Sequence, residues 1–121
     1  MKTGTRLGVA LIAGCLIAKR NASAIFDCFN SRTFIYSGIV SPDRIYIFDQ
    51  ERKCHMISGD AVSSTYTIHD GCNGQHISLL VNENQFSGYD YNSCSNFKGD
   101  VNGNFISLHD FEDMRYHHYS F

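Results

Sequence analysis

Short runs of β-branched and aromatic residues, separated every few positions by turn-forming residues, make up the chain from Ile25 to Phe121. No stretch of this region places apolar residues at i, i+3, i+4 and i+7 over three turns, as an amphipathic helix requires. The single proline, Pro42, falls in a turn and removes no hydrogen bond from a strand. The pattern predicts an all-β domain, either a β-sandwich or a small barrel with hairpin or Greek-key connections. We expect ten strands, over residues 25–29, 33–40, 44–48, 53–57, 62–69, 76–81, 85–91, 95–101, 105–109 and 115–121.

The dipeptide Asn102-Gly103 is the clearest turn signal in the chain. It separates the alternating segment Phe97–Val101 from a second extended segment, Phe105–Leu108. Asn and Gly accept positive φ at low cost, and a type I′ turn matches the twist of paired strands. We therefore expect a β-hairpin with a type I′ turn here, and a second hairpin tip at Asn73-Gly74.

An internal repeat accompanies these turns. Residues 73–79 and 102–108 are identical at five of seven positions. A looser match aligns Asp27 with Asp90 and Asp49 with Asp110, each near the end of an expected strand. Duplication of a unit and repetition of similar turns by one sheet topology both explain such matches.

Residues 1–24 have the composition of a secretory signal peptide. Lys2 and Arg6 precede the apolar run Leu7–Ala18, and the small residues Ala22-Ser23-Ala24 follow. We expect cleavage after Ala24, which leaves residues 25–121 as a single β domain. The apolar run is too short to span a bilayer, so we expect no membrane span.

Two other readings of this segment stay open. Ile12–Cys15 resembles a bacterial lipobox, in which the cysteine is lipidated, although the sequence stays apolar after Cys15. Lys19-Arg20 is a dibasic pair, and processing there would begin the mature chain at Asn21.

An even number of cysteines remains after the leader is removed: Cys28, Cys54, Cys72 and Cys94. In an exported chain this predicts two disulfides that staple the β domain. No pair has the C-x-x-C spacing of a zinc or redox site. Three pairings are open, and we favour nested pairing, Cys54 with Cys72 and Cys28 with Cys94, because it suits strands that open and close a sandwich.

Six basic residues face twelve acidic residues once residues 1–24 are removed, a formal charge of −6. Nucleic acids and anionic membranes attract clusters of Lys and Arg, which this region lacks apart from Arg52-Lys53. We therefore expect no nucleic-acid partner and no anionic membrane partner.

Six histidines are the residues best suited to bind a metal or move a proton. His117 and His118 are adjacent in an expected strand and should face opposite sides, so they cannot chelate one ion together. His69 and His76 flank a turn and could approach each other across a hairpin. A zinc site needs three or four convergent ligands, so we expect no metal, no cofactor and no catalytic residue set, and we expect the histidines to be solvated.

Four tyrosines, Tyr89, Tyr91, Tyr116 and Tyr119, are candidate contacts for a protein partner or a sugar. Their alternative role is in core or cross-strand packing, the usual place of aromatics in sheets. The last expected strand, residues 115–121, is also a candidate edge strand, whose unpaired backbone groups would dock a partner.

The C-terminal third carries a family resemblance through Phe97-Lys98-Gly99, Val101–Asn104, Ile106–Leu108 and Tyr119-Ser120-Phe121. With the leader, the size and the four cysteines, it resembles the small secreted cysteine-containing effectors of ascomycete plant-pathogenic fungi. Within them it looks like the companion-effector type that is associated with plasmodesmata. The resemblance implies a secreted, non-enzymatic virulence protein in the host apoplast or host cell, which binds a second secreted effector or a host protein.

Two further resemblances supply alternative functions. Ser41–Phe48 resembles a strand of small guanyl-specific fungal ribonucleases, in which the residue matching Arg44 pairs with the scissile phosphate. The chain lacks room before Arg44 for that family's helix and catalytic Glu strand. The rhythm of aromatic strands and tight turns resembles βγ-crystallin domains, structural or ligand-binding modules of paired Greek keys. Their calcium motif is not found here, so the resemblance implies no calcium ligand.

Overall fold

The computed structural model describes residues 1–121 as one helix inside a closed antiparallel barrel of ten strands. All ten expected strands are present, with ends that shift by a few residues at most. The helix is α1 (Thr3–Ala18). The strands are β1 (Ala24–Asp27), β2 (Arg32–Ser41), β3 (Arg44–Asp49), β4 (Cys54–Ser58), β5 (Thr65–Asp70), β6 (Gln75–Asn82), β7 (Gln85–Asp90), β8 (Ser95–Asn102), β9 (Phe105–Asp110) and β10 (Arg115–Ser120).

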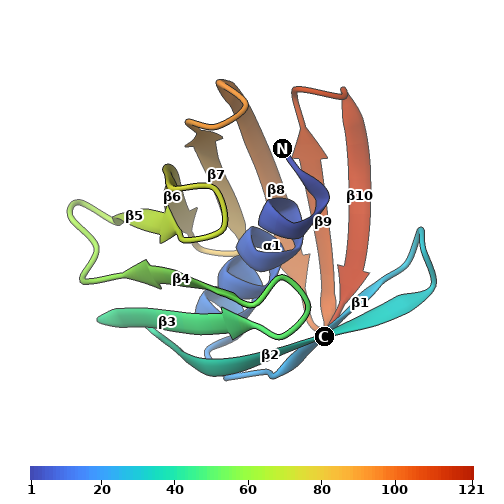
Figure 1. Cartoon of the computed structure of the whole chain (residues 1–121), viewed down its shortest axis with the longest axis horizontal. Helices are drawn as coiled ribbons and strands as arrows, with labels where there is room; N and C mark the ends of the chain where they lie inside the picture. The colour runs from blue at the N-terminus through green and yellow to red at the C-terminus, as the bar shows by residue number, and fades with distance from the viewer.

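Every strand pairs with its neighbours in sequence, and β1 pairs with β10 to close the ring (Figure 1). The prediction of an all-β fold with hairpin connections is confirmed, whereas Greek-key connections are not found. The prediction of β10 as an edge strand is wrong. It pairs with β9 at six positions, and with β1 through Tyr119↔Asp27 and Ser120↔Phe26.

Helix α1 runs through the middle of the barrel (Figure 1). Residues Val9–Ala13 have 0 % exposed surface, and they share one core with the inward side chains of the strands. A helix that is apolar on all sides is stable only when it is enclosed, and the barrel encloses this one. The structure thus shows the uncut chain, and cleavage after Ala24 stays a prediction. No helix of the structure is both long and apolar enough to cross a lipid bilayer.

Alternation along the strands explains how the barrel wall is built. In β3, β5 and β9, buried positions alternate with more exposed ones, as a sheet with one face on a core requires. Two glycines let large rings fill the interior: Gly99 pairs with Phe86, and Gly88 pairs with Phe97. An added Cβ at either glycine would overlap the opposite Phe ring and a strand carbonyl, so these positions require glycine.

The two ends of the barrel use different turns. At one end, called here the aspartate end, each of five turns follows a strand that ends in Asp. The fourth residue after each Asp has positive φ; these residues are Ser31, Lys53, Gly74, Cys94 and Met114. At the opposite end, called here the tight-turn end, two-residue loops join β2 to β3, β6 to β7 and β8 to β9.

Asn102-Gly103 does form a hairpin tip, but the turn differs from the predicted type I′. Asn102 pairs with Phe105, so the loop residues are Gly103 and Asn104. Only Gly103 has positive φ, at +60°, as in a type II′ turn. Asn73-Gly74 also lies in a turn, with Gly74 at φ +72°, but at the aspartate end. The matching segments 73–79 and 102–108 therefore begin at opposite ends of the barrel and are not equivalent in the fold. The looser match of aspartates does agree with the structure, in which an Asp at the end of a strand begins each turn of the aspartate end.

One of the two predicted disulfides is present. Cys54 and Cys72 are joined, with Cα atoms 5.4 Å apart, which confirms that pairing. Cys28 and Cys94 are free and exposed. They lie in two different turns of the aspartate end, and the turn between β9 and β10 separates those turns. The predicted Cys28–Cys94 bridge is therefore not formed.

Candidate functional site

Five buried aspartates form the rim of the barrel at the aspartate end. The Oδ1 atom of each aspartate accepts a hydrogen bond from the backbone N–H of the residue two positions later, with N···Oδ1 distances of 2.9 to 3.0 Å. The five residues are Asp27, Asp49, Asp70, Asp90 and Asp110, all at most 5 % exposed. Asp accepts such a local bond readily, which is why it is favoured in turns. Each carboxylate therefore fixes its own turn through Oδ1, and the Oδ2 atoms are left for other partners.

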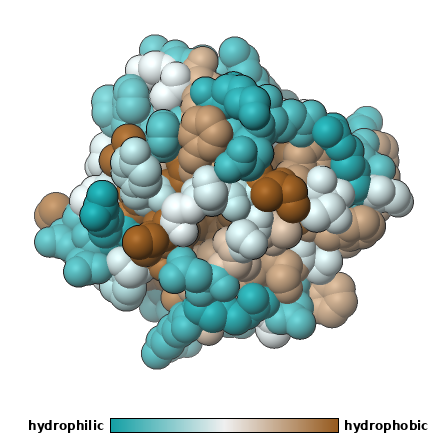
Figure 2. All heavy atoms as spheres, turned by 60° about the horizontal axis from the view of Figure 1, so that its bottom comes forward, coloured by the Kyte–Doolittle hydropathy of each residue, from teal (hydrophilic) through white to brown (hydrophobic).

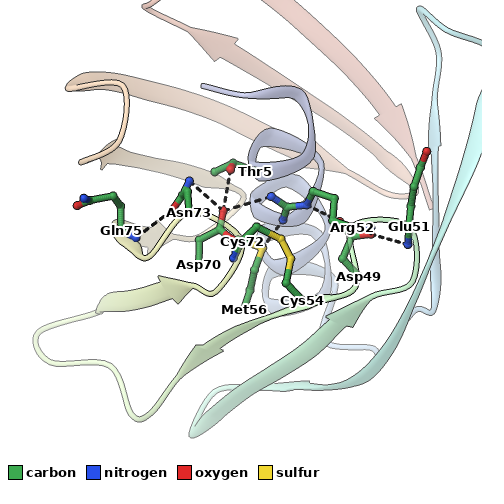
Figure 3. Close-up of a disulfide and its surroundings, with 10 residues drawn as sticks. All are labelled: Thr5, Asp49, Glu51, Arg52, Cys54, Met56, Asp70, Cys72, Asn73 and Gln75. Atoms are coloured by element: carbon green, nitrogen blue, oxygen red, sulfur yellow. Dashed lines mark hydrogen bonds and ion pairs between the residues drawn. A yellow bond between two sulfur atoms is a disulfide. The ribbon is translucent and has the colours of Figure 1, made fainter.

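Asp49 and Asp70 share one guanidinium (Figure 3). Arg52 Nε donates to Asp49 Oδ2 at 2.6 Å, and its Nη1 lies 3.4 Å from Asp70 Oδ2. Thr5 of α1 also donates its hydroxyl to Asp70 Oδ2, at 2.7 Å. Burial works against the charge of Arg52, but the hydrogen bond to Asp49 and the two negative charges outweigh it and raise the pKa of Arg52.

Asp110 holds the cations of the N-terminal segment. Arg6 Nη1 lies 3.0 Å from Asp110 Oδ2, and the Met1 ammonium lies 2.8 Å from the same atom. Arg6 Nε donates to the hydroxyl of Tyr119 at 3.2 Å. Burial raises the pKa of that hydroxyl to about 12, so Tyr119 stays neutral and accepts this bond at ordinary pH.

A carboxylate and a histidine extend this cluster toward solvent. Asp113 Oδ2 lies 3.9 Å from Arg6 Nη1 and 2.8 Å from His117 Nε2. Partial burial would raise the pKa of Asp113, but its hydrogen bond with His117 and the nearby positive charges lower it overall. Potential ligand atoms of Asp110, Asp113 and His117 lie within 4.8 Å of one another. A divalent ion would have to compete there with Arg6, which already supplies a positive charge.

A second set with ligand-like spacing comprises Cys54, Asp70 and Cys72. Its two sulfur atoms form the disulfide, so they are not available as thiolate ligands. Its carboxylate is already occupied by Thr5 and Arg52.

The outside of the C-terminal hairpin carries four neighbouring rings, His109, Phe111, Tyr116 and His118, called here the outer aromatic cluster. The His109 ring centroid lies 4.6 Å from those of both Phe111 and Tyr116. Tyr116 and His118 are stacked at 6.3 Å. Tyr116 is 60 % exposed and Phe111 is 38 % exposed. Nδ1 of His109 is buried without a hydrogen-bond partner, and Ser107 contacts Nδ1 of His118 at 3.0 Å.

A shallow groove of about 730 Å³ runs along the outer wall beside this cluster, across strands β6 to β10. Small side chains such as Ser87 and Ser107 leave it hollow, and Tyr116 and His118 form one side. Polar groups of Asn82, Gln85, Lys98 and Asp100 also face it. On the face shown in Figure 2, hydrophobic side chains are scattered among hydrophilic ones.

The four candidate tyrosines occupy three different environments. Tyr116 belongs to the outer aromatic cluster. Tyr89 and Tyr91 form an edge-to-face pair at 4.8 Å beside the free Cys94, and Tyr91 is exposed. Tyr119 is only 1 % exposed and points into the barrel, so it cannot contact a partner on the outer surface.

The structure also shows where the paired histidines lie and where Arg44, the residue of the ribonuclease resemblance, lies. His69 and His76 pair across β5 and β6, with ring centroids 5.2 Å apart, as expected for a hairpin. His117 contacts Asp113 whereas His118 contacts Ser107. Arg44 lies at the tight-turn end, exposed, with its guanidinium 5.4 Å from the Tyr46 ring centroid.

Sequence reasoning missed the aspartate rim and its two arginines. The signal was present, since an Asp recurs about every 20 residues at the end of an apolar alternation. The looser match pairs Asp27 with Asp90 and Asp49 with Asp110, and it does not include Asp70. Arg6 was missed because it was assigned to the leader. No family model, no curated protein and no solved structure matches this chain.

Proposed function

We propose that this protein is exported and acts without catalysis, by binding a protein partner through the outer aromatic cluster. The observation that carries the proposal is the exposure of neighbouring aromatic rings on a wall whose inner face already supplies the core. Exposed aromatic groups that are preassembled lose little conformational entropy on binding, and aromatic residues dominate interface energetics. The partner is a second secreted effector or a host protein, as the resemblance of the C-terminal third implies.

The adjacent groove supports this proposal by supplying orientation. No hydrogen bond within the protein involves the side chains of Gln85 or Ser87, so their polar atoms are free for a partner, and Lys98 Nζ lies 5.8 Å from the Phe111 ring centroid, beside the cluster. An interface with an aromatic centre and a polar margin is typical of specific complexes. A flexible or extended segment of the partner fits such a groove better than a flat surface does.

Export is supported by the leader-like residues 1–24 and by the Cys54–Cys72 disulfide, which is characteristic of oxidising compartments. The secreted protein is expected to begin at Ile25, or at Asn21 if it is processed after Arg20. Its intact mass after alkylation, with and without reduction, gives both the first residue and the number of disulfides. One disulfide is expected from the structure, and four free thiols would contradict export through an oxidising compartment.

Binding is tested with a pair of matched variants. Phe111→Ser with Tyr116→Ala removes two exposed rings of the cluster, and Tyr46→Ala removes an exposed Tyr from another part of the wall. A partner captured by cross-linking is purified, and its affinity is measured by calorimetry against all three proteins. We expect at least a tenfold loss for the double variant and no change for Tyr46→Ala.

Equal affinity of all three proteins would exclude the outer aromatic cluster as the interface. Ribonuclease activity that disappears in Arg44→Ala would favour the enzyme alternative instead. Activity that disappears on chelation would likewise replace this proposal with a metal-dependent one.

A further inference from the structure

The barrel interior is complementary to a helix, because both sides of the contact are sealed from solvent. On the helix side, Val9–Ala13 are fully buried, and on the barrel side Ile45, Ile68 and Ile106 are equally buried. Close packing of this kind requires the interior to match its occupant in width and shape. The occupant is about 10 Å wide, the diameter of an α-helix with its side chains.

Three glycines of α1 lie against side chains of the wall. A Cβ at Gly8 would overlap the Met56 sulfur, and a Cβ at Gly4 would overlap the Arg52 side chain. At Gly14 an added Cβ would meet Ile106 Cδ1 at 2.8 Å. Translocation of a leader requires apolarity but no glycine at particular positions. Gly4 and Gly8 lie one turn apart, so with its side chains in their present positions the barrel accommodates small residues at this spacing.

Charge fixes the direction in which the helix enters. Arg6 reaches Asp110 and Tyr119, and Thr5 reaches Asp70, all at the aspartate end. A helix inserted in the opposite direction would leave Asp110 buried without its Arg partner, which is costly for a buried carboxylate. The aspartate rim thus selects a basic residue close to the N-terminal end of the occupant.

The connection between α1 and β1 is exposed and short. Lys19, Arg20 and Asn21 are exposed, and Lys19, which caps α1 after Ala18, has φ +57°. Asn21 Oδ1 accepts the Val40 N–H, and the Ser23 carbonyl accepts the Tyr36 N–H, so the chain is anchored again before β1 begins. A cut between Arg20 and Asn21 would break none of these contacts of the wall.

We propose that the barrel interior is a binding site for an apolar helix with small residues one turn apart and a basic residue near its N-terminal end. In the uncut chain α1 fills the site in cis. Once the connection is cut, the site accepts residues 1–20 of this chain in trans, from the same or a second copy. The partner class is an apolar segment with a basic start, the composition that residues 1–20 share with secretory leaders.

The test uses the full-length protein with a recognition sequence for a site-specific protease inserted between Arg20 and Asn21. After cutting, we expect native mass spectrometry to find peptide and barrel as one complex. A fluorescent peptide of residues 1–20 should exchange into the complex and saturate it. Exchange is measured under native conditions and again after unfolding in urea and refolding, so that slow release is not mistaken for absence of binding.

Variant peptides distinguish recognition from general hydrophobic binding. Peptides with Arg6→Glu or Gly8→Leu should compete at least tenfold more weakly than the unchanged peptide. A peptide with Lys2→Gln is the matched control and should compete equally, because the Lys2 side chain is exposed and makes no ion pair. Dodecylamine, a cationic apolar chain without helical shape, should not displace the peptide at equal concentration.

Three results would overturn the proposal. The first is that the peptide leaves on cutting and that labelled peptide is not taken up, either under native conditions or after refolding. This result counts whether or not circular dichroism shows that the barrel stays folded. The second is equal competition by the unchanged, Arg6→Glu and Gly8→Leu peptides. The third is displacement by dodecylamine as efficient as displacement by the peptide.

Discussion

The two ends of the barrel reverse the chain by different physical means. At the aspartate end, five turns share one solution, in which a buried carboxylate accepts the N–H two residues later and the fourth residue takes positive φ. At the tight-turn end two loops share a solution without a carboxylate acceptor: Glu83-Asn84 and Gly103-Asn104 each have positive φ at the first residue, whereas Pro42-Asp43 has none. The first end carries buried charge that must be matched elsewhere. The second has no buried carboxylate, and its loops are joined to other segments only by uncharged acceptors, as where Tyr66 donates to the Pro42 carbonyl and Arg20 to Asn104 Oδ1.

This difference divides the molecule into a coupled end and an autonomous end. The carboxylates of Asp49, Asp70 and Asp110 also bind Arg52, Thr5 and Arg6, so three turns of the coupled end are joined to α1 or to each other. Asp27 and Asp90 use their second oxygen within their own turns, on Asn30 and Ser93. Changes at the coupled end should therefore affect stability more than changes at the autonomous end.

The largest effect is expected for Asp110→Ala. It removes the nearest carboxylate of buried Arg6, and breaking such a pair typically costs about 3 to 5 kcal/mol. Asp90→Ala loses only a local turn acceptor, for which about 1 to 3 kcal/mol is typical. Asp43→Ala at the tight-turn end changes an exposed side chain and should cost less than about 0.5 kcal/mol.

Urea unfolding of the full-length chain measures these three values. If Asp110→Ala cost no more than Asp90→Ala, the coupling of the aspartate end to α1 would be contradicted.

The disulfide gives the next largest effect, and it separates two kinds of cysteine within the aspartate end. Replacing Cys54 and Cys72 by Ser should lower the free energy of unfolding by about 3 kcal/mol, the usual value for a loop of this length. Replacing Cys28 and Cys94 by Ser should change it by less than about 0.5 kcal/mol, since both are free and exposed. Thermal unfolding of both double variants under oxidising conditions makes the comparison. A similar loss in both would indicate that Cys28 and Cys94 pair after all.

Glycine substitutions compare the two ends at equal local geometry. Gly74 and Gly103 have positive φ at opposite ends, and neither has an atom within 4 Å of an added Cβ. Changing either to Val should therefore cost about 1 kcal/mol or more through backbone strain alone. Gly59 has the same open surroundings without positive φ, so Gly59→Ala is the control and should be nearly neutral.

Chemical unfolding of the three glycine variants checks this result. If Gly74→Val and Gly103→Val lowered the free energy of unfolding by different amounts, the two ends would differ in how well their backbone tolerates strain as well as in their side-chain contacts.

The strands could be predicted from the sequence because their alternation and their turn residues are local signals. The sequence also locates the turn at Gly103, but not its type, because the loop is shifted by one residue to Gly103-Asn104, a Gly-first pair that forms a type II′ turn. Closure of the barrel could not be predicted, since pairing of β1 with β10 joins the two ends of the β domain and leaves no local trace. The prediction of an edge strand at residues 115–121 is wrong for that reason, because β10 pairs with β1.

The position of the helix inside the barrel and the ion pairs of Arg6 could not be predicted from the sequence for a different reason. An apolar run with a basic start has one composition whether it is a leader or a buried helix, and Leu7–Ala18 fits both. Arg6 was therefore separated from Asp110, which lies more than a hundred residues later. The sequence leaves both an exposed and a core role open for Tyr119, because alternation along a strand does not tell which face is the interior.

The smallest expected effect is a change in the pKa of one carboxylate at each end, Asp113 and Asp43. The pKa of Asp113 is lowered because its hydrogen bond with His117 outweighs partial burial, and the pKa of Asp43 is lowered mainly by the hydroxyl of Ser41. A folded pKa below the ordinary value of 3.8 stabilises the protein above that pH, and the contribution is lost as the pH falls through the folded value. His117→Ala should therefore raise the pKa of Asp113 toward 3.8 and leave Asp43 unchanged, whereas Ser41→Ala should do the reverse. Carbon-13 NMR titration of the side-chain carboxyls measures both values in each variant. A shift of Asp43 in His117→Ala would mean that the tight-turn end is electrostatically coupled to the aspartate end, against the division of the molecule into two independent ends.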